Sequence, residues 1–183
     1  SPSIFSATFT WKLNWLETLE AAKSFPNYQL IIAGAPNKDV AFYQNVAKGT
    51  EVRILENQTY DLLNNSDLAI VTSGTATLET ALFHVPQVVC YKASPISYAI
   101  GKRVIKIKFI SLVNLILDRL VVTELIQHDL TPEKIVKELK LIAQPQSEGR
   151  IKMEKSYVEL ESKLGGGGAS EKVASLLINK INA

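Results

Sequence analysis

Short apolar runs alternate with helix-forming segments along the first two thirds of the chain. The runs are nearly continuous, which is typical of strands buried on both faces, and they cover residues 28–34, 51–55, 68–71, 87–91 and 109–113. Helical spacing of apolar positions lies between them, over residues 11–25, 39–47, 59–65, 76–83 and 95–105. Because parallel strands need such crossovers, the pattern predicts an α/β fold with a Rossmann-like doubly wound parallel sheet.

The last third of the chain has a helical pattern. Residues 131–143 begin with Thr-Pro-Glu, a helix start, and one face of this helix carries Ile135, Val136, Leu139 and Ile142. Further C-terminal helices are expected over residues 149–164 and 169–181. The four glycines between them, at 165–168, are interpreted as a natural helix break rather than an engineered linker.

The beginning of the chain fits this scheme poorly. Residues 1–10 contain at best a weak strand and no glycine-containing turn, and the helix after them is expected to bury Leu13, Leu16, Leu19 and Ala22. We therefore divide the chain into an atypical N-terminal lead over 1–15, a Rossmann-like domain over 16–144, and a helical extension of the same domain over 145–183.

Composition narrows the class of protein. The chain has 183 residues, 46% of them hydrophobic and 21% charged, which suits one soluble domain. A formal net charge of +2 is by itself too small to indicate a nucleic-acid partner, and the single Cys90 favours a reducing compartment. No membrane span or signal peptide is visible, and a start at Ser1 with Met153 as the only methionine suggests a processed or partial polypeptide.

The stretch T-S-G-T-A-T-L-E, residues 72–79, joins an apolar run to a helix. In an open α/β sheet, helix N-termini at the carboxyl ends of strands point free N–H groups at ligands. Gly74 would let a phosphate approach the backbone, and hydroxyl donors are available at Ser73, Thr75 and Thr77. Glu79 leans back toward the helix start and can accept hydrogen bonds from a ribose diol. The alternative is an ordinary capped helix with an acid near its start.

A basic segment follows. There is no acid between Glu79 and Asp118, and the cations in this gap are Lys92, Lys102, Arg103, Lys106 and Lys108. Interleaved with aliphatic residues, they can meet a diphosphate or an anionic membrane surface, or simply form a solvated helix face. Aromatic residues are too few for a nucleic-acid stacking platform.

Residues 111–127 also border the predicted ligand crevice. They carry polar side chains among aliphatic ones: Asn114, Asp118, Arg119, Glu124 and Gln127. An ordinary surface set of ion pairs around Arg119 is the alternative to a role in binding. Neither His84 nor His128 has a metal-like or triad-like partner nearby in the sequence, so we expect no metal site.

Taken in order, these pieces resemble one family. Their order resembles the C-terminal, donor-binding half of the lipid-A-disaccharide synthase family. The matching pieces are, in order, S-G-T-A-T-L-E, a V-P pair, a Y-K step, the basic segment, S-L-x-N-L-I and E-L-I-Q. The resemblance covers residues 28–183 and is most specific over 72–127. It implies a GT-B fold, in which two Rossmann-like domains face a cleft, with residues 16–144 as the nucleotide-sugar-binding part.

The resemblance also implies a reaction. The family transfers 2,3-diacylglucosamine from UDP to 2,3-diacylglucosamine 1-phosphate with inversion, at the cytoplasmic face of the bacterial inner membrane, and no metal or cofactor is expected. By position, Ser73, Gly74 and Thr75 would face the diphosphate and Glu79 the ribose. The donor pocket would be lined by Asn114, Arg119, Glu124 and Gln127.

This chain departs from the family in its first residues. Residues 1–15 lack the family's G-S-R turn, and the N-terminal acceptor domain, where the general base is expected, is absent from the sequence, so the chain alone should not form disaccharide. Two alternatives stay open. One is another GT-B enzyme using UDP-N-acetylglucosamine, such as the peptidoglycan glycosyltransferase or the non-hydrolysing 2-epimerase. The other is a non-catalytic nucleotide-binding or membrane-surface module.

Overall fold

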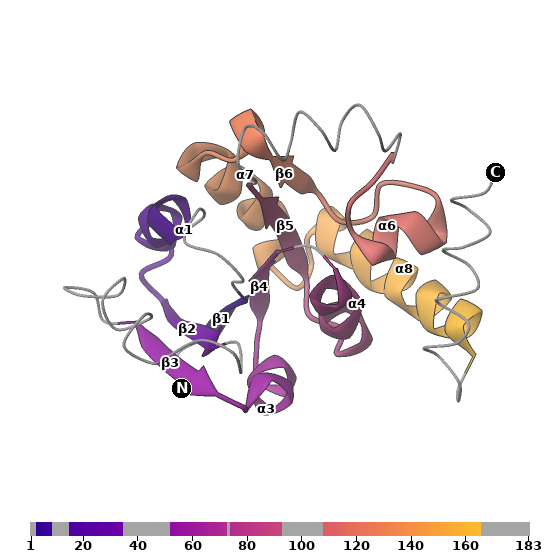
Figure 1. Ribbon diagram of the computed structural model, residues 1–183, viewed down its shortest axis with the longest axis horizontal. Helices are drawn as coiled ribbons and strands as arrows, with labels where there is room; N and C mark the ends of the chain where they lie inside the picture. The colour runs from indigo at the N-terminus through magenta and orange to yellow at the C-terminus, as the bar shows by residue number, and fades with distance from the viewer. Residues whose placement is uncertain (1–2, 9–14, 35–51, 73, 93–107, 166–183) are drawn as a thin grey trace.

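The centre of the protein is a six-stranded parallel sheet (Figure 1). A computed structural model describes residues 3–8, 15–34, 52–72, 74–92 and 108–165. The strands follow the order β3-β2-β1-β4-β5-β6, with the bounds β1 Ser3–Thr8, β2 Tyr28–Gly34, β3 Arg53–Glu56, β4 Leu68–Val71, β5 Gln87–Tyr91 and β6 Glu124–Ile126. All five pairings are parallel, which confirms the predicted α/β fold with a doubly wound sheet.

The expectation of at best a weak strand near the N-terminus is wrong. Residues 3–8 form β1, which pairs with β2 on one side and β4 on the other. Small polar residues are tolerated there because they are satisfied within the sheet: buried Ser6 donates its hydroxyl hydrogen bond to the Leu68 carbonyl at 3.3 Å. Asp67, just before β4, accepts from the Ile4 amide at 2.8 Å through its carboxylate. The lead therefore contains a central strand of the same sheet.

The predicted strand over residues 109–113 is also wrong. Only Ser111 makes a strand-like contact there, an isolated parallel bridge to Gly74, and helix α6 (Leu112–Leu117) begins directly after it. The Ile110 and Ser111 amides donate to the Glu124 carboxylate, both at 2.9 Å, instead of to a neighbouring strand. The sixth strand is β6, which lies beyond α6 and pairs with β5.

Helices cover both faces of the sheet (Figure 1). The remaining helices of eight or more residues are α1 (Trp15–Ala22), α4 (Thr75–Leu82), α7 (Pro132–Ala143) and α8 (Glu148–Leu164), and α3 (Thr59–Asn64) is shorter. On one face α1 packs against α7, while α3 and α4 lie on the other; α8 packs against α7 as well as against α4 and α6. Helices expected over 39–47, 95–105 and 169–181 lie outside the described residues.

Alternation along β4 divides the core between these faces. Leu68 and Ile70 belong to the large cluster that includes α1 and α7, whereas Ala69 and Val71 pack with Leu63 of α3. All four residues of β4 are buried, as expected of a strand with helices on both sides. The continuous apolar run thus predicted β4 correctly.

The expected helix faces are partly confirmed. Helix α7 buries Ile135, Leu139 and Ile142 as predicted, after a start at which the Thr131 hydroxyl accepts from the Lys134 amide. Helix α1 fully buries Trp15, Thr18 and Ala21. Of the positions predicted to be buried, Leu19 and Ala22 are partly buried against the core, Leu16 is 80% exposed, and Leu13 lies outside the described residues.

The predicted stop of the long C-terminal helix is confirmed at its first glycine. Helix α8 ends at Leu164, and Gly165 caps it with a φ of 56°, a backbone conformation that favours glycine. Within the described segments, no helix combines the length and the apolar character that crossing a membrane requires.

We predict that truncating the β1 side chain Phe5 strongly destabilises the fold. Phe5 is 1% exposed and its ring lies 6.1 Å from that of Phe25, so Phe5→Ala should lower the free energy of unfolding by about 3–5 kcal/mol in urea denaturation. The control Leu16→Ala, at an exposed position, should change it by no more than about 0.5 kcal/mol. Similar small effects of both substitutions would contradict the central position of β1.

Candidate functional site

The strand order has a topological switch point at β1. Strands β2 and β3 extend the sheet on one side of β1, and β4, β5 and β6 extend it on the other. At such a switch point the connections leave the carboxyl ends of the strands in opposite directions, which opens a ligand crevice between them. The segments that follow β2, β3, β4, β5 and β6 begin near Gly34, Asn57, Thr72, Lys92 and Gln127.

The turn before α4 exposes backbone at this edge. Gly74 caps α4 with φ 87° and ψ −149°, a conformation that residues with a side chain rarely adopt. A Cβ atom built on Gly74 would meet nothing within 4 Å, so the backbone there is open to close approach. Thr75, the first helical residue, is exposed, and Ser73 lies outside the described residues. These features fit an anion bound at the helix start.

Thr77 does not offer its hydroxyl to a ligand, contrary to expectation. The residue is fully buried, and its Oγ1 donates to the Gly74 carbonyl at 2.8 Å. The same oxygen accepts from the Leu112 amide at 3.2 Å. Its hydrogen-bonding capacity is therefore used inside the protein, at the junction of α4 and α6.

Glu79 borders a hollow that the sequence did not reveal. This Glu79 hollow has a volume of about 460 Å³ and is lined by Gly34, Glu79 and residues 57–61. Glu79 is partly exposed, one turn inside α4, while Asn57 follows β3 with a left-handed φ of 54°. A carboxylate beside a polar hollow, close to an open helix start, can bind the hydroxyls of a sugar attached to a phosphate. The only sequence signal for residues 57–61 was an asparagine directly after a strand, a type that tolerates a left-handed turn.

Asn114 and Glu124 lie together, but their polar atoms are engaged within the chain. Buried Asn114 accepts from the Val121 and Val122 amides at 2.8 and 3.0 Å, and donates to the Val122 carbonyl and the Glu124 carboxylate at 2.8 and 2.9 Å. Glu124 in turn holds the Ile110 and Ser111 amides. The pair thus fixes the segment that places Ser111 beside Gly74.

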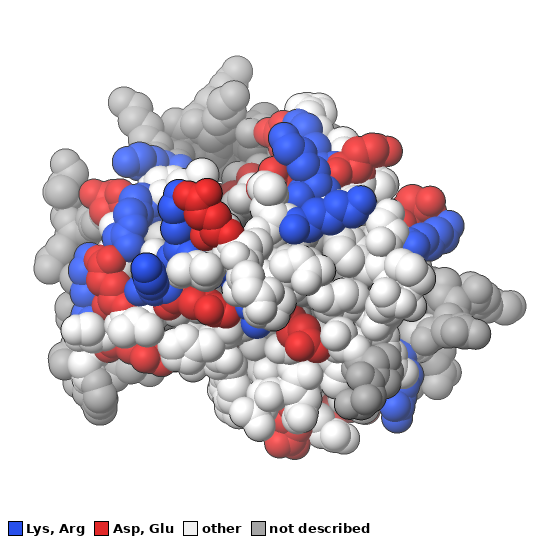
Figure 2. Space-filling view, turned by 180° about the vertical axis from the view of Figure 1, so that it is seen from behind, with Lys and Arg blue, Asp and Glu red and all other residues white. Residues whose placement is uncertain are grey.

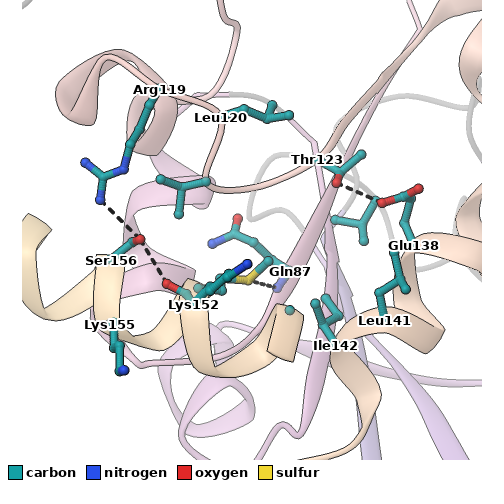
Figure 3. Close-up of a pocket in the computed structure, with 14 residues that line it drawn as sticks. Gln87, Arg119, Leu120, Thr123, Glu138, Leu141, Ile142, Lys152, Lys155 and Ser156 are labelled. Carbon is teal, nitrogen blue, oxygen red and sulfur yellow. Dashed lines mark hydrogen bonds between the residues drawn. The ribbon is translucent and has the colours of Figure 1, made fainter. Parts of the chain in front are cut away.

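Arg119 lies in a different hollow (Figure 3). Its guanidinium pairs with Glu159 of α8 at 2.6 Å and donates to the Ser156 hydroxyl at 3.2 Å, so it does not join the expected ion-pair set of residues 118–124. This Arg119 hollow, of about 500 Å³, lies between the segment before β6, α7 and α8, near the start of β5. The structure therefore does not bring Arg119 together with Glu79, whose hollow shares none of these lining residues.

Two further predicted residues lie at the carboxyl edge. Gln127 follows β6 and has a left-handed φ of 53°. Lys92 follows β5 and pairs with Glu17, in the first turn of α1, at 2.7 Å.

Cys90, two residues before Lys92, is fully buried, and desolvation, helped by the charge of Glu17, raises the pKa of its thiol well above the usual range. The thiol is therefore not poised as a nucleophile.

Most of the predicted basic segment lies outside the described residues. Lys102, Arg103 and Lys106 lie outside the described residues, and Lys108 is exposed with its ammonium 5.2 Å from the Phe109 ring centre. Seen from behind, the described surface intersperses acidic and basic side chains rather than gathering one sign (Figure 2). The prediction of a membrane or phosphate contact for this segment stays a prediction.

Comparison with known sequences decides the family. A family profile described as lipid-A-disaccharide synthetase matches residues 15–177. The chain belongs to this family. It is 43% identical over 131 residues to the lipid-A-disaccharide synthase of Syntrophus aciditrophicus, an alignment covering 71% of this chain and 34% of that protein. It is 34% identical over 168 residues to that of Myxococcus xanthus, covering 88% and 44%. The chain thus spans less than half the length of these lipid-A-disaccharide synthases.

Solved structures show the same fold at low sequence identity. UDP-GlcNAc 2-epimerase from Neisseria meningitidis, bound to UDP-GlcNAc, has a TM-score of 0.57 and 19% identity, over 97% of this chain and 45% of that one. Arabidopsis thaliana UGT89C1, complexed with UDP, has a TM-score of 0.55 and 14% identity, over 100% and 44%. The likeness confirms the GT-B type of α/β fold for this member of the lipid-A-disaccharide synthetase family.

We predict that Asn114→Ala is strongly destabilising in this protein. It would leave the Val121 and Val122 amides without their acceptor, so the free energy of unfolding should fall by about 3–5 kcal/mol in urea denaturation. The control Asn65→Ala removes one exposed bond, to the Asp61 carbonyl, and should cost no more than about 1 kcal/mol. Equal losses would show that the Asn114 amide does not hold this loop.

Proposed function

We propose that this chain is the UDP-sugar-binding half of a lipid-A-disaccharide synthase. In this proposal, α4 binds UDP-2,3-diacylglucosamine, and the complete enzyme transfers the sugar to 2,3-diacylglucosamine 1-phosphate with inversion. The observation that carries the proposal is the combination on one helix of the open Gly74 turn and Glu79, which borders a hollow at the carboxyl edge of the sheet. Membership of the family supports the choice of substrates.

The diphosphate and the ribose of the donor would bind different parts of α4. The diphosphate carries negative charge, which the free N–H groups and the positive end of a helix dipole stabilise. As UDP leaves, charge grows on the same diphosphate, so this stabilisation would increase in the transition state without a resident metal or cofactor. Gly74 and Thr75, with Ser73, would face this group.

The ribose would lie one turn further along the helix. The Glu79 carboxylate can accept hydrogen bonds from both ribose hydroxyls, and charge-assisted bonds of this kind are about twice as strong as neutral ones. The base would then extend into the Glu79 hollow toward residues 57–61. Asn114 and Glu124 would act from behind, by holding Ser111 beside Gly74, and Gln127 would border the donor from β6.

The remaining parts of the reaction would come from outside this chain. The chain covers 34% to 44% of the lipid-A-disaccharide synthases compared above, so the acceptor site and its general base are proposed to lie in the rest of the enzyme. Both lipid substrates place the reaction at the cytoplasmic face of the inner membrane. Lys92 and Lys108, with Lys102, Arg103 and Lys106, are candidates for contact with that surface or with phosphate.

We predict that Glu79→Gln weakens binding of UDP but not of pyrophosphate. The amide loses charge-assisted acceptance from the ribose hydroxyls, on the order of 1.5 to 3 kcal/mol, which should raise the Kd of UDP by about 10- to 150-fold. It also removes a negative charge near the phosphates, so pyrophosphate should bind equally well or slightly better. Isothermal titration of both ligands, with thermal unfolding recorded alongside, measures the difference.

A matched control for this substitution is Glu133→Gln. Glu133 is also near the start of a helix, α7, but is exposed and not part of the Glu79 hollow, so neither ligand should be affected. If Glu79 merely stabilised its helix, the unfolding temperature would fall and both ligands would weaken in parallel. That result, or a wild-type chain that does not bind UDP at millimolar concentration, would defeat the ribose assignment.

A further inference from the structure

Helix α4 contains two fully buried threonines whose hydroxyls have different partners. Thr77 and Thr80 are both 0% exposed, and each donates from Oγ1 to a carbonyl nearer the N-terminus at 2.8 Å. Thr80 bonds to Ala76, inside the helix. Thr77 bonds to Gly74, the residue that caps the helix and makes the turn at the proposed diphosphate site.

Thr77 also connects α4 to two other elements. Its Oγ1 accepts from the Leu112 amide at 3.2 Å, at the start of α6. Its carbonyl accepts from Nε2 of Gln87, the first residue of β5, at 3.0 Å. One buried residue therefore joins the cap of α4, the start of α6 and the start of β5.

The Gln87 side chain extends this connection to α8. Its Nε2 also donates to the Tyr157 hydroxyl at 3.2 Å, and that hydroxyl donates to the Val85 carbonyl at 3.3 Å. Burial raises the pKa of Tyr157 well above its usual range, so the hydroxyl keeps the proton that it donates. The first turn of α4 is thus supported on its inner side by a chain of hydrogen bonds through Thr77, Gln87 and Tyr157, all of which are buried.

These bonds determine the orientation of the Gly74 peptide. The Gly74 carbonyl receives two hydrogen bonds from Thr77, from the amide at 3.2 Å and from Oγ1 at 2.8 Å. The neighbouring Ser111 is held beside Gly74 by the parallel bridge. Glycine can adopt many backbone conformations, so its surroundings must select this one, and Thr77 contributes to that selection on the inner side of the turn.

We propose that Thr77 is a positioning residue for the diphosphate: it sets the Gly74 turn from inside the protein and does not touch the ligand. The proposal rests on the proposed UDP site at α4. Because the turn carries the phosphate contacts and Glu79 carries the ribose contacts, loss of the Thr77 hydroxyl should affect the diphosphate and spare the nucleoside. A residue with a purely structural role would lower stability without this selectivity.

The experiment compares Thr77→Val with Thr80→Val in the full chain. Valine keeps the shape of threonine and removes the hydroxyl, so both variants lose the bond from Oγ1 to a carbonyl nearer the N-terminus, and Thr77→Val also leaves the Leu112 amide without its acceptor. Thr77→Val should raise the Kd of UDP about ten-fold, or about 1.4 kcal/mol, while the Kd of uridine stays within about two-fold. Thr80→Val should leave both dissociation constants within about two-fold, and Thr77→Ser, which restores the hydroxyl, should recover UDP binding.

Each of the following results would overturn the proposal. Equal UDP affinity in Thr77→Val and Thr80→Val would assign Thr77 a structural role only, and so would a parallel loss of UDP and uridine binding. A wild-type chain that binds no UDP would overturn the proposed function and this inference together, whereas wild-type binding with an unaffected Thr77→Val overturns this inference alone. If the valine variant does not fold, Thr77→Cys replaces the hydroxyl by a thiol, a weak donor and acceptor, without opening a large cavity, and gives the same comparison.

Discussion

The structure depends on the parallel pairing of β1 with both β2 and β4. Because the chain leaves β1 in one direction and returns to its other side at β4, the carboxyl ends of these strands begin connections that diverge. The open Gly74 turn follows β4, and the Glu79 hollow includes the end of β2. Without β1 in the middle, neither feature would face a crevice.

The strands were predictable from sequence where burial is two-sided and continuous, as in β2, β4 and β5. Strand β1 was predicted to be weak at best because Ser3, Ser6 and Thr8 interrupt its apolar pattern, and nothing local shows that the Ser6 hydroxyl bonds to a carbonyl 62 residues away. The prediction of a strand over residues 109–113 was wrong for the opposite reason. They have a strand-like pattern, but the Glu124 carboxylate takes the Ile110 and Ser111 amides out of any ladder.

The candidate site, too, was predictable where it depends on local sequence and not where it depends on contacts made by the fold. The positions of Gly74 and Glu79 follow from a local strand–turn–helix sequence, and the structure places both residues at the carboxyl edge of the sheet. The burial of Thr77, the hydrogen bond between Asn114 and Glu124, and the position of Arg119 beside Glu159 depend on partners 35, 10 and 40 residues away, which no local motif indicates. Residues 57–61 carry no motif, and only their position after β3 brings them to the hollow.

We propose that UDP binds at the start of α4 and in the Glu79 hollow rather than in the Arg119 hollow. Two-dimensional amide NMR during a UDP titration tests it most directly, because each hollow has its own lining amides. We expect shifts at Gly74, Thr75, Glu79 and residues 57–61, with Lys152 and Ser156 unchanged, and weaker shifts with ADP. Shifts confined to the Arg119 hollow, or none at millimolar UDP, would contradict it.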